Sequence, residues 1–458
     1  MARKKKEIEL PQITQEELIQ QKAIGEIARD AFLDFGNYIN NQRHTAFIQD
    51  GCKPSYRRLI YSALQFPKGK MIPSTTVISS VANYHPHSLS GIEELNANLV
   101  HTGVFEGHGS WGYTEINGVY NQYAAPRYTK QMVSDVYNRV LGELWKEVPM
   151  VESPVGPMEI SYLPLPIPLC LYMKTSVTGL CIGVKNDYPN FSPKSLYQAY
   201  INNNPLLLEP NANLIIDKEN SELDRLWKTG KGRVIYSYKL TRVTDDFGNP
   251  GILFEGDTFL FTPNFKKFKK LAEEGKVYME DLTDINGPKM VISKVPGARG
   301  ISIEEIEDLA RKCCYSATNY TTNVTTGSTM FRIGLYDWLD YTYKNYIDLI
   351  VKVNQKKIEK TTFDIAVLEA IPLISDYILN KNPKATDEEI MKVFGMLQEI
   401  VSSVMSKPIS YLRKNKDTSD RIKELKTRLK ELKKFDPVAY TEPVSYTHLR
   451  AHETSQDL

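Results

Sequence analysis

Cysteine is scarce in this sequence, and long apolar runs are missing. The five cysteines in 458 residues form no Cys-x-x-Cys pair, so neither a zinc ribbon nor a disulfide framework is indicated, and a reducing compartment such as the cytoplasm is expected. No apolar run reaches the roughly 18 residues that a membrane-spanning helix needs. The basic start, residues 2–6, is followed by no signal-peptide core, so no membrane partner is expected.

Net charge is nearly absent as well. Lysine and arginine number 57 against 55 aspartates and glutamates, a difference of +2, so the overall charge predicts no partner and local charge must be examined. The hydrophobic fraction of 41% and the charged fraction of 24% are typical of a globular protein that buries a core. The length predicts about three domains.

The first part of the chain predicts helices around one tight turn. Residues 13–42 have the composition of a helix, and Asp50-Gly51-Cys52 predicts a turn. Pro54 suits the first position of a second helix. The apolar face of that helix is formed by Leu59, Ala63 and Leu64. This pattern resembles a helix-turn-helix unit.

From about residue 155 the chain predicts a mixed α/β region. Five prolines between residues 154 and 168 exclude long helices there. Residues 178–184 and 233–241 predict strands, the second with strict alternation of apolar side chains. Residues 245–250 predict the turn after that strand.

From about residue 331 the chain predicts helices again. Apolar residues repeat at spacings of three and four over 335–353 and again over 422–432, after a cap candidate at Thr418 or Ser419. Two amphipathic helices far apart in sequence favour an antiparallel coiled-coil arm. Two ordinary core helices would give the same periodicity.

Basic residues gather between residues 38 and 80. Six cations face one acid, Asp50, which gives 6 − 1 = +5 in a nearly neutral protein. The six are Arg43, Lys53, Arg57, Arg58, Lys68 and Lys70. A cluster of this kind on helix-turn-helix scaffolding suits contact with a phosphate backbone; a solvated basic face is the simpler alternative.

Three further motifs follow in order. His85 and His87 flank Pro86 and could donate to a phosphate, although isolated histidines are more often structural. A glycine-rich loop over residues 107–112 could bring backbone amides close to a ligand. Arg127 directly precedes Tyr128. A phenol, with a pKa of about 10, attacks phosphorus only with help from cations and a proton acceptor.

The order and spacing of these motifs resemble the breakage-reunion chain of type IIA topoisomerases, which is the A subunit of bacterial DNA gyrase and topoisomerase IV. The resemblance covers about residues 25–440, and the length is most similar to the medium subunit of T-even-type bacteriophages. Its further motifs are Ile167-Pro168, Thr178 to Gly183, Gly230 to Val234, and Pro408 to Leu412.

The resemblance implies a multidomain α+β fold. Residues 1–30 would be an N-terminal arm, 31–155 a winged-helix (CAP-like) domain with the tyrosine, and 156–334 an α/β tower domain. Residues 335–440 would form a long antiparallel coiled coil with a helical dimer gate. Residues 441–458 would be a tail, of which 444–454 look like the translated end of a sequencing adapter.

The resemblance also implies roles for single residues. Tyr128 would be the nucleophile that forms a 5′-phosphotyrosyl link with double-stranded DNA, and Ile167 would wedge between base pairs. The catalytic groups around the phosphate would be Arg127, Arg43, Lys53, His85 and His87. Further DNA contacts would come from Arg57, Arg58, Lys68 and Lys70.

Other parts of the machinery are expected on other chains. No Gly-x-x-x-x-Gly-Lys-Ser/Thr loop occurs, and the family's Glu plus Asp-x-Asp metal cluster is missing from the sequence. Mg²⁺ and ATP are therefore expected on a separate ATPase/TOPRIM subunit, with this chain a homodimer through its coiled-coil gate. Ser88 and Leu89 depart from the family pattern, which leaves drug sensitivity open, although Ser90 and Glu94 still match drug-contacting positions. A His-motif nicking enzyme and a non-catalytic architectural DNA-binding protein are the alternatives.

Overall fold

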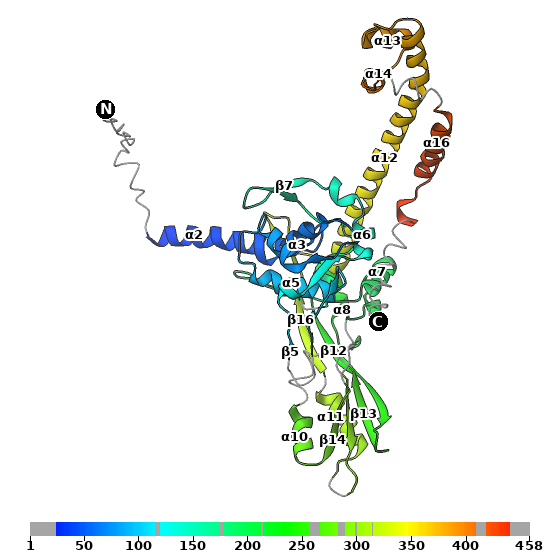
Figure 1. The fold of residues 1–458 in the computed structure, drawn as a ribbon. Helices are drawn as coiled ribbons and strands as arrows, with labels where there is room; N and C mark the ends of the chain where they lie inside the picture. Colours follow the sequence, from blue (N-terminus) through cyan, green and yellow to red (C-terminus); the bar gives the residue numbers. More distant parts are fainter. Residues whose placement is uncertain are drawn as a thin grey trace, which may run out of the picture.

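The computed structural model describes residues 24–114, 120–174, 177–211, 214–255, 266–282, 289–297, 300–313, 315–408 and 418–439. A central body carries three extensions (Figure 1). These are helix α2 (Ile24–Ile39), the long helix α12 (Leu335–Asn380) with a small helical lobe at its tip, and a lobe of strands and helices at the opposite end. Within the described ranges, no helix is long and apolar enough to cross a membrane.

The first half of the central body combines helices with small sheets. Strands β2, β6 and β3 form a three-stranded antiparallel sheet beside the helices. The elements are a π-helical turn (Asn40–His44), β1 (Ala46–Phe47), α3 (Pro54–Leu64), β2 (Ile72–Pro73), α4 (Ser74–Val81), α5 (Ser90–His101), β3 (Phe105–His108), β4 (Tyr113–Thr114), β5 (Tyr120–Asn121), a 3₁₀ turn (Pro126–Tyr128), β6 (Lys130–Val133), α6 (Asp135–Leu141), a 3₁₀ turn (Leu144–Glu147), β7 (Met150–Glu152) and β8 (Met158–Ile160). This arrangement is compatible with a winged-helix domain, which stays a prediction.

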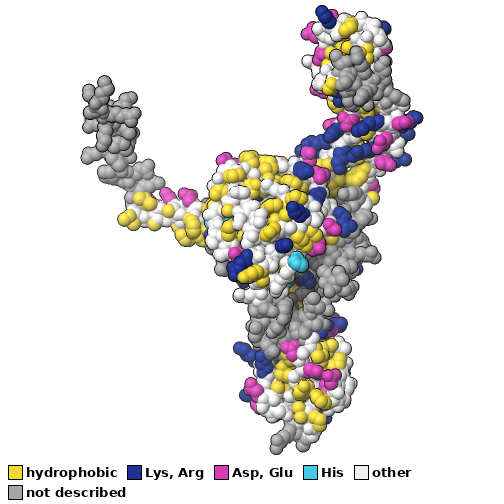
Figure 2. Space-filling view, in the orientation of Figure 1, with side chains coloured by type: hydrophobic (Ala, Val, Ile, Leu, Met, Phe, Trp, Pro, Cys, Tyr) yellow, Lys and Arg dark blue, Asp and Glu magenta, His cyan; other side chains and the backbone are white. Residues whose placement is uncertain are grey.

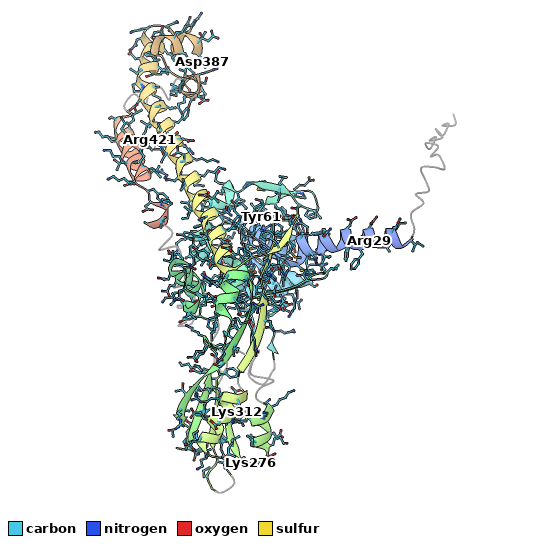
Figure 3. The ribbon with its side chains drawn as sticks, turned by 180° about the vertical axis from the view of Figure 1, so that it is seen from behind. Arg29, Tyr61, Lys276, Lys312, Asp387 and Arg421 are labelled. Atoms are coloured by element: carbon cyan, nitrogen blue, oxygen red, sulfur yellow. The ribbon has the colours of Figure 1, made fainter. Side chains whose placement is uncertain are left out.

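Helix α3 begins at Pro54, as predicted, because proline's fixed φ and missing N–H suit the first helical position. Leu59 and Ala63 are buried, and the same helix places Tyr61 in the central body (Figure 3). The predicted helix over residues 13–42 is confirmed from Ile24 onward; its earlier part lies outside the described residues. Helix α2 exposes several apolar side chains, visible along the arm in Figure 2.

The second region is a mixed helix and sheet structure, as predicted. Its main sheet has the order β14-β15-β13-β12-β16-β10-β9, with β11 paired to β12. The strands are β9 (Val177–Leu180), β10 (Lys185–Tyr188), β11 (Leu214–Ile216), β12 (Lys231–Thr244), β13 (Pro250–Glu255), β14 (Val277–Asp281), β15 (Lys289–Lys294) and β16 (Tyr315–Thr321). The helical pieces are a 3₁₀ turn (Leu169–Leu171), α7 (Pro193–Asn202), a 3₁₀ turn (Pro205–Leu207), α8 (Leu223–Thr229), α10 (Lys266–Glu273) and α11 (Ile303–Cys313). A second small sheet, β1-β17-β18, includes β17 (Asn323–Thr325) and β18 (Met330–Arg332).

Strand β12 extends from the central body into the lobe that contains β13, β14, β15, α10 and α11, called the outer lobe below (Figure 1). Its buried side chains Val234, Tyr236 and Tyr238 alternate as the sequence predicts. Beyond them β12 pairs with β13 through the predicted turn, where the carboxylate of Asp245 accepts the backbone N–H of Asn249 at 2.7 Å. Lys276 and Lys312 mark this outer lobe in Figure 3.

Helix α12 confirms the heptad pattern of residues 335–353, whose repeating side chains are buried. Its first half packs on the central body. There, the indole of Trp338 donates to the carbonyl of Ile48 at 2.9 Å, and the hydroxyl of Tyr346 donates to the carbonyl of Val140 at 2.8 Å. This half of the helix is therefore a core helix of the body.

The second half of α12 pairs with the returning helix α16 (Ser419–Lys433). Asn354 donates to the carbonyl of Leu432 at 3.0 Å, and Thr418 donates to the carbonyl of Leu368 at 3.0 Å. The contact farther along α12 is made by the earlier residue of the returning segment, so the two helices run antiparallel, as predicted. Lys and Arg side chains line this pair in Figure 2.

A proline inside α12 explains the contact at Thr418. Pro372 has no N–H, so the carbonyl of Leu368, four residues earlier, lacks its usual helical donor. The hydroxyl of Thr418 donates to that carbonyl. Thr418 is the residue before α16, but its side chain does not cap that helix, which corrects the predicted capping role of this residue.

A second hydrophobic core forms at the tip of the arm. Helices α13 (Asp387–Phe394) and α14 (Gln398–Met405) pack on the end of α12 around Ile374, Ile390 and Val401. The hydroxyl of Thr386 and the side chain of Glu389 form a reciprocal capping box that starts α13. Asp387 marks this lobe in Figure 3.

Candidate active site

Tyr128 ends a short 3₁₀ turn and faces solvent. The turn spans Pro126–Tyr128, and the amide of Tyr128 donates to the carbonyl of Ala125 at 2.9 Å. The side chain of Tyr128 is 67% exposed. The guanidinium carbon of Arg127 lies 4.7 Å from the centre of its ring, so the two side chains form a cation–π pair at the surface.

The turn is fixed from behind by Thr129. Its hydroxyl donates to the hydroxyl of Ser74 at 2.8 Å, and its carbonyl accepts the amide of Ser74 at 3.0 Å. The glycine-rich loop also approaches this turn. Gly109 has a φ of +106°, and a Cβ there would lie 2.9 Å from the carbonyl oxygen of Tyr128, so only glycine fits without a shift.

Basic side chains gather near the end of α4. The charges of Arg43 and Lys53 act on His44, and the charge of Arg43 also acts on His85 and His87. The ammonium of Lys53 donates to the backbone carbonyl of residue 178 in β9. The next residue of β9 is Gly179, where a Cβ would overlap the backbone oxygen of His44. Only a glycine lets β9 approach the backbone this closely.

The histidines of this cluster are held neutral. Burial and then the charge of Arg58 lower the pKa of His85 to about 4. Burial and then Arg43 lower the pKa of His87, and burial followed by Lys53 lowers the pKa of His44. Protonating an embedded imidazole beside fixed cations is unfavourable. At neutral pH the cluster therefore combines the charge of Arg43 with neutral imidazoles, while burial lowers the pKa of Lys53.

Helix α4 connects the cluster with the tyrosine turn. Ser74, at its first residue, bonds to Thr129, and the carbonyl of Val81, at its last residue, accepts the amide of His85 at 2.9 Å. Seven steps of an α-helix rise by about 10 Å. The sequence motifs around His85 and Tyr128 thus meet opposite ends of one short helix.

Arg57 and Arg58 are buried, whereas the sequence predicted that they belong to an exposed basic cluster. They are 6% and 5% exposed. Arg57 donates to both carboxylate oxygens of Asp50, at 2.8 and 3.1 Å, and Arg58 donates to both oxygens of Glu159, at 2.8 and 2.9 Å. Both side chains form ion pairs inside the fold, so their exposure does not support the predicted DNA contacts, which stay predictions.

Ile167 also belongs to the interior, since it is 4% exposed. A wedge must reach the bases, so this position does not support the predicted wedge. The neighbouring Pro168 packs on the Asp50-Gly51 turn: Gly51 has a φ of +66°, and a Cβ there would lie 2.6 Å from the Pro168 side chain. This part of the motif is explained by packing.

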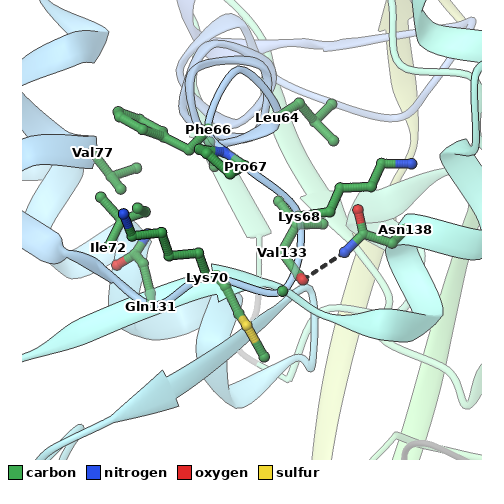
Figure 4. Close-up of a pocket in the computed structure, with 13 residues that line it drawn as sticks. Leu64, Phe66, Pro67, Lys68, Lys70, Ile72, Val77, Gln131, Val133 and Asn138 are labelled. Carbon is green, nitrogen blue, oxygen red and sulfur yellow. Dashed lines mark hydrogen bonds between the residues drawn. The ribbon is translucent and has the colours of Figure 1, made fainter.

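Lys68 and Lys70 lie on the exposed loop after α3, at the rim of a small cavity (Figure 4). Their side chains extend in opposite directions there. The ammonium of Lys68 is 3.8 Å from the carboxylate of Glu143, a pair that is more than half exposed and so contributes little stability. Both lysines can reach a ligand on this surface.

Comparison with known proteins places the chain in a family. Its sequence matches the family of the DNA gyrase/topoisomerase IV A subunit over residues 43–442. The chain belongs to this family.

Two relatives, both named as the A subunit of DNA topoisomerase 4, show the extent of the likeness. The one from Escherichia coli (strain K12) is 26% identical over 223 residues, which cover 46% of this chain and 27% of that protein. The one from Staphylococcus aureus (strain N315) is 21% identical over 460 residues, covering 91% of this chain and 56% of that protein. The chain thus spans only part of these relatives' lengths.

The gyrase/topoisomerase IV A family match includes every candidate site residue but leaves helix α2 outside. Sequence reasoning missed Glu159, whose partner Arg58 lies 101 residues away, so no local pattern could reveal the pair. It also missed His44, although that residue directly follows Arg43. Within the described residues, no group of three or more His, Cys, Asp or Glu side chains could hold a metal ion.

Proposed function

We propose that this chain is the DNA-cleaving and religating component of an ATP-dependent type II DNA topoisomerase, with Tyr128 as its nucleophile. The observation that carries the proposal is the exposed Tyr128 beside Arg127, on a turn anchored to α4, in a chain of the gyrase/topoisomerase IV A family. Its relatives carry the name of the A subunit of DNA topoisomerase 4.

The proposed reaction is a transesterification. The phenol of Tyr128 gives up its proton to water as its oxygen attacks the phosphorus and forms a 5′-phosphotyrosyl bond. The bond from phosphorus to the 3′ oxygen breaks, and that oxygen leaves and takes up a proton from water. The reverse reaction restores the DNA, so religation needs no outside energy. Arg127, Arg43 and Lys53 would stabilise the negative charge that develops at phosphorus.

The histidines would act as neutral donors. With their pKa values lowered, His85 and His87 carry no charge at pH 7, and each can present one N–H to a phosphate oxygen. Lys68 and Lys70 would contact the DNA backbone farther out. Arg57 and Arg58 are not proposed as phosphate ligands, because each forms an ion pair with a carboxylate inside the fold.

Mg²⁺ and ATP would be bound by a separate ATPase/TOPRIM subunit, as the family resemblance implies. The described residues offer no cluster that would hold a metal. Mg²⁺ would supply charge at the phosphate when the complex is assembled.

A homodimer would form through the lobe at the tip of α12. This lobe exposes Leu373, Val393 and Leu397, although its own core is complete. Apolar side chains exposed together suit a second copy of the chain. Sedimentation is expected to show a dimer at micromolar concentration; a monomer at every concentration would contradict this contact.

The nucleophile is tested by Tyr128→Phe. With a partner subunit, Mg²⁺, ATP and plasmid DNA, the wild-type chain should yield DNA carrying protein at its 5′ end after a detergent quench. The variant should bind DNA but form no adduct, because only the attacking oxygen is lost. Tyr123→Phe is the matched control and should retain cleavage. An adduct from Tyr128→Phe, or one at the 3′ end, would contradict the proposal.

A further inference from the structure

Glu159 and Arg58 form a buried ion pair behind the histidine cluster. Glu159 lies on β8 and Arg58 on α3, and their side chains are 10% and 6% exposed. The Nε of Arg58 donates to Oε2 of Glu159 at 2.8 Å, and Nη2 donates to Oε1 at 2.9 Å. Two parallel bonds fix the plane of a guanidinium as well as its position.

The remaining nitrogen of this guanidinium faces His85. Nη1 of Arg58 lies 3.4 Å from Nδ1 of His85. The amide of His85 is held by the carbonyl of Val81, and its ring meets the ring of His87 edge-on, with centroids 5.3 Å apart. One side chain from α3 and one from β8 thus determine what the Nδ1 edge of the imidazole meets.

This contact selects one tautomer of His85. A guanidinium has no acceptor, so Nδ1 must accept, and a neutral ring then carries its proton on Nε2. The pKa of about 4 keeps the ring neutral at pH 7. The Nε2–H group is on the side of the ring away from Arg58.

We propose that Glu159 is a positioning residue that acts through Arg58 on His85, so that His85 presents a fixed Nε2–H donor to a phosphate oxygen of bound DNA. This inference rests on the proposed function of the site. Stability alone does not explain the pair, because apolar residues of similar size often replace a buried ion pair without loss.

Replacing both partners of the ion pair by apolar residues tests the positioning role of Glu159. In the double variant Arg58→Met with Glu159→Met, neither partner is left as an unpaired buried charge. In the full chain, with a short DNA duplex and a partner subunit, the cleavage rate at saturating DNA should fall about 10- to 100-fold, since a misplaced donor mainly costs the chemical step. The half-saturating DNA concentration should change less than about threefold.

A double-mutant cycle separates positioning from general structure. In a His85→Ala background there is no ring to orient, so the Met pair should change the cleavage rate less than about twofold. Equal losses in both backgrounds would overturn the inference. The matched control is Arg242→Met with Glu307→Met, an ion pair of the outer lobe, which should leave cleavage unchanged.

The titration of His85 gives a readout that does not need activity. In histidine-labelled chain, followed by NMR and assigned with His85→Gln, the Met pair should raise the pKa of His85 from about 4 toward 6.5. The rise is partial, because burial remains the largest cause. An unchanged pKa would overturn the inference. If wild type forms no 5′ adduct, the proposed function fails, while this titration still decides whether the pair governs His85.

Discussion

Asp50 lies fully buried at the turn before α3, and Asp50→Asn tests how much its carboxylate stabilises this part of the fold. The carboxylate is fully buried and accepts four hydrogen bonds. Two come from Arg57, at 2.8 and 3.1 Å, and two from the backbone amides of Cys52 and Leu163, both at 2.9 Å. Each carboxylate oxygen accepts two of these hydrogen bonds, so both oxygens are fully used as acceptors.

Asparagine has the same shape but one acceptor oxygen. Its oxygen can keep two of the four bonds, and its NH₂ group then faces the other two donors. Losing two charge-assisted bonds costs about 1.5–3 kcal/mol each, in line with the roughly 3–5 kcal/mol for removing one partner of a buried ion pair. We expect the local free energy of unfolding to fall by about 3–5 kcal/mol.

Hydrogen exchange measures this locally, because the two backbone donors report on the site. The amides of Cys52 and Leu163 should exchange about 150- to 4,000-fold faster in Asp50→Asn, since each 1.4 kcal/mol is a factor of ten. Asp224→Asn makes the same chemical change in an exposed pair with Lys228 and should leave exchange at both amides unaltered. Less than tenfold acceleration at both would refute the reasoning.

Three further changes have defined outcomes. Gly51→Ala forces a methyl group to 2.6 Å from a proline carbon at a φ of +66°, so the melting temperature should drop, with strain of at least about 1–3 kcal/mol; an unchanged melting curve would contradict it. Thr418→Val leaves the carbonyl of Leu368 without its hydroxyl donor and should destabilise the helical arm by about 1 kcal/mol, seen as faster exchange in α12 near that residue but not in the outer lobe. Between pH 6.5 and about 4, His85 is protonated in the unfolded chain but neutral in the folded chain. The free energy of unfolding should therefore decrease as pH falls through this window. Urea titrations of His85→Gln should show a shallower fall than wild type, and identical slopes would count against the low pKa.

Periodic features were predictable from the sequence because they are local. Pro54 starts α3, and the heptad spacing over residues 335–353 marks a buried helix face. Both interpretations of that spacing hold in part: α12 is a core helix along the body and one member of an antiparallel pair beyond it. Periodicity cannot say which partner a buried face meets.

The roles of single charged residues were less predictable. The excess of basic residues suggested an exposed surface, yet Arg57 and Arg58 point inward. Asp50, the one acid in that segment, was a signal for the first pair, whereas Glu159 is distant in sequence. Burial of Ile167 likewise depends on tertiary packing around the Asp50-Gly51 turn.

The proline in α12 has a mechanical consequence. At Pro372 the helix lacks an internal bond, and the hydroxyl of Thr418, from the opposite helix, supplies a donor to the freed carbonyl. Helix α12 is therefore expected to stay stiff at Pro372 only while Thr418 and α16 remain packed against it. Peeling α16 away would therefore soften α12 at this one place, so that separation of the helices and bending of the arm toward its tip become a single coupled motion.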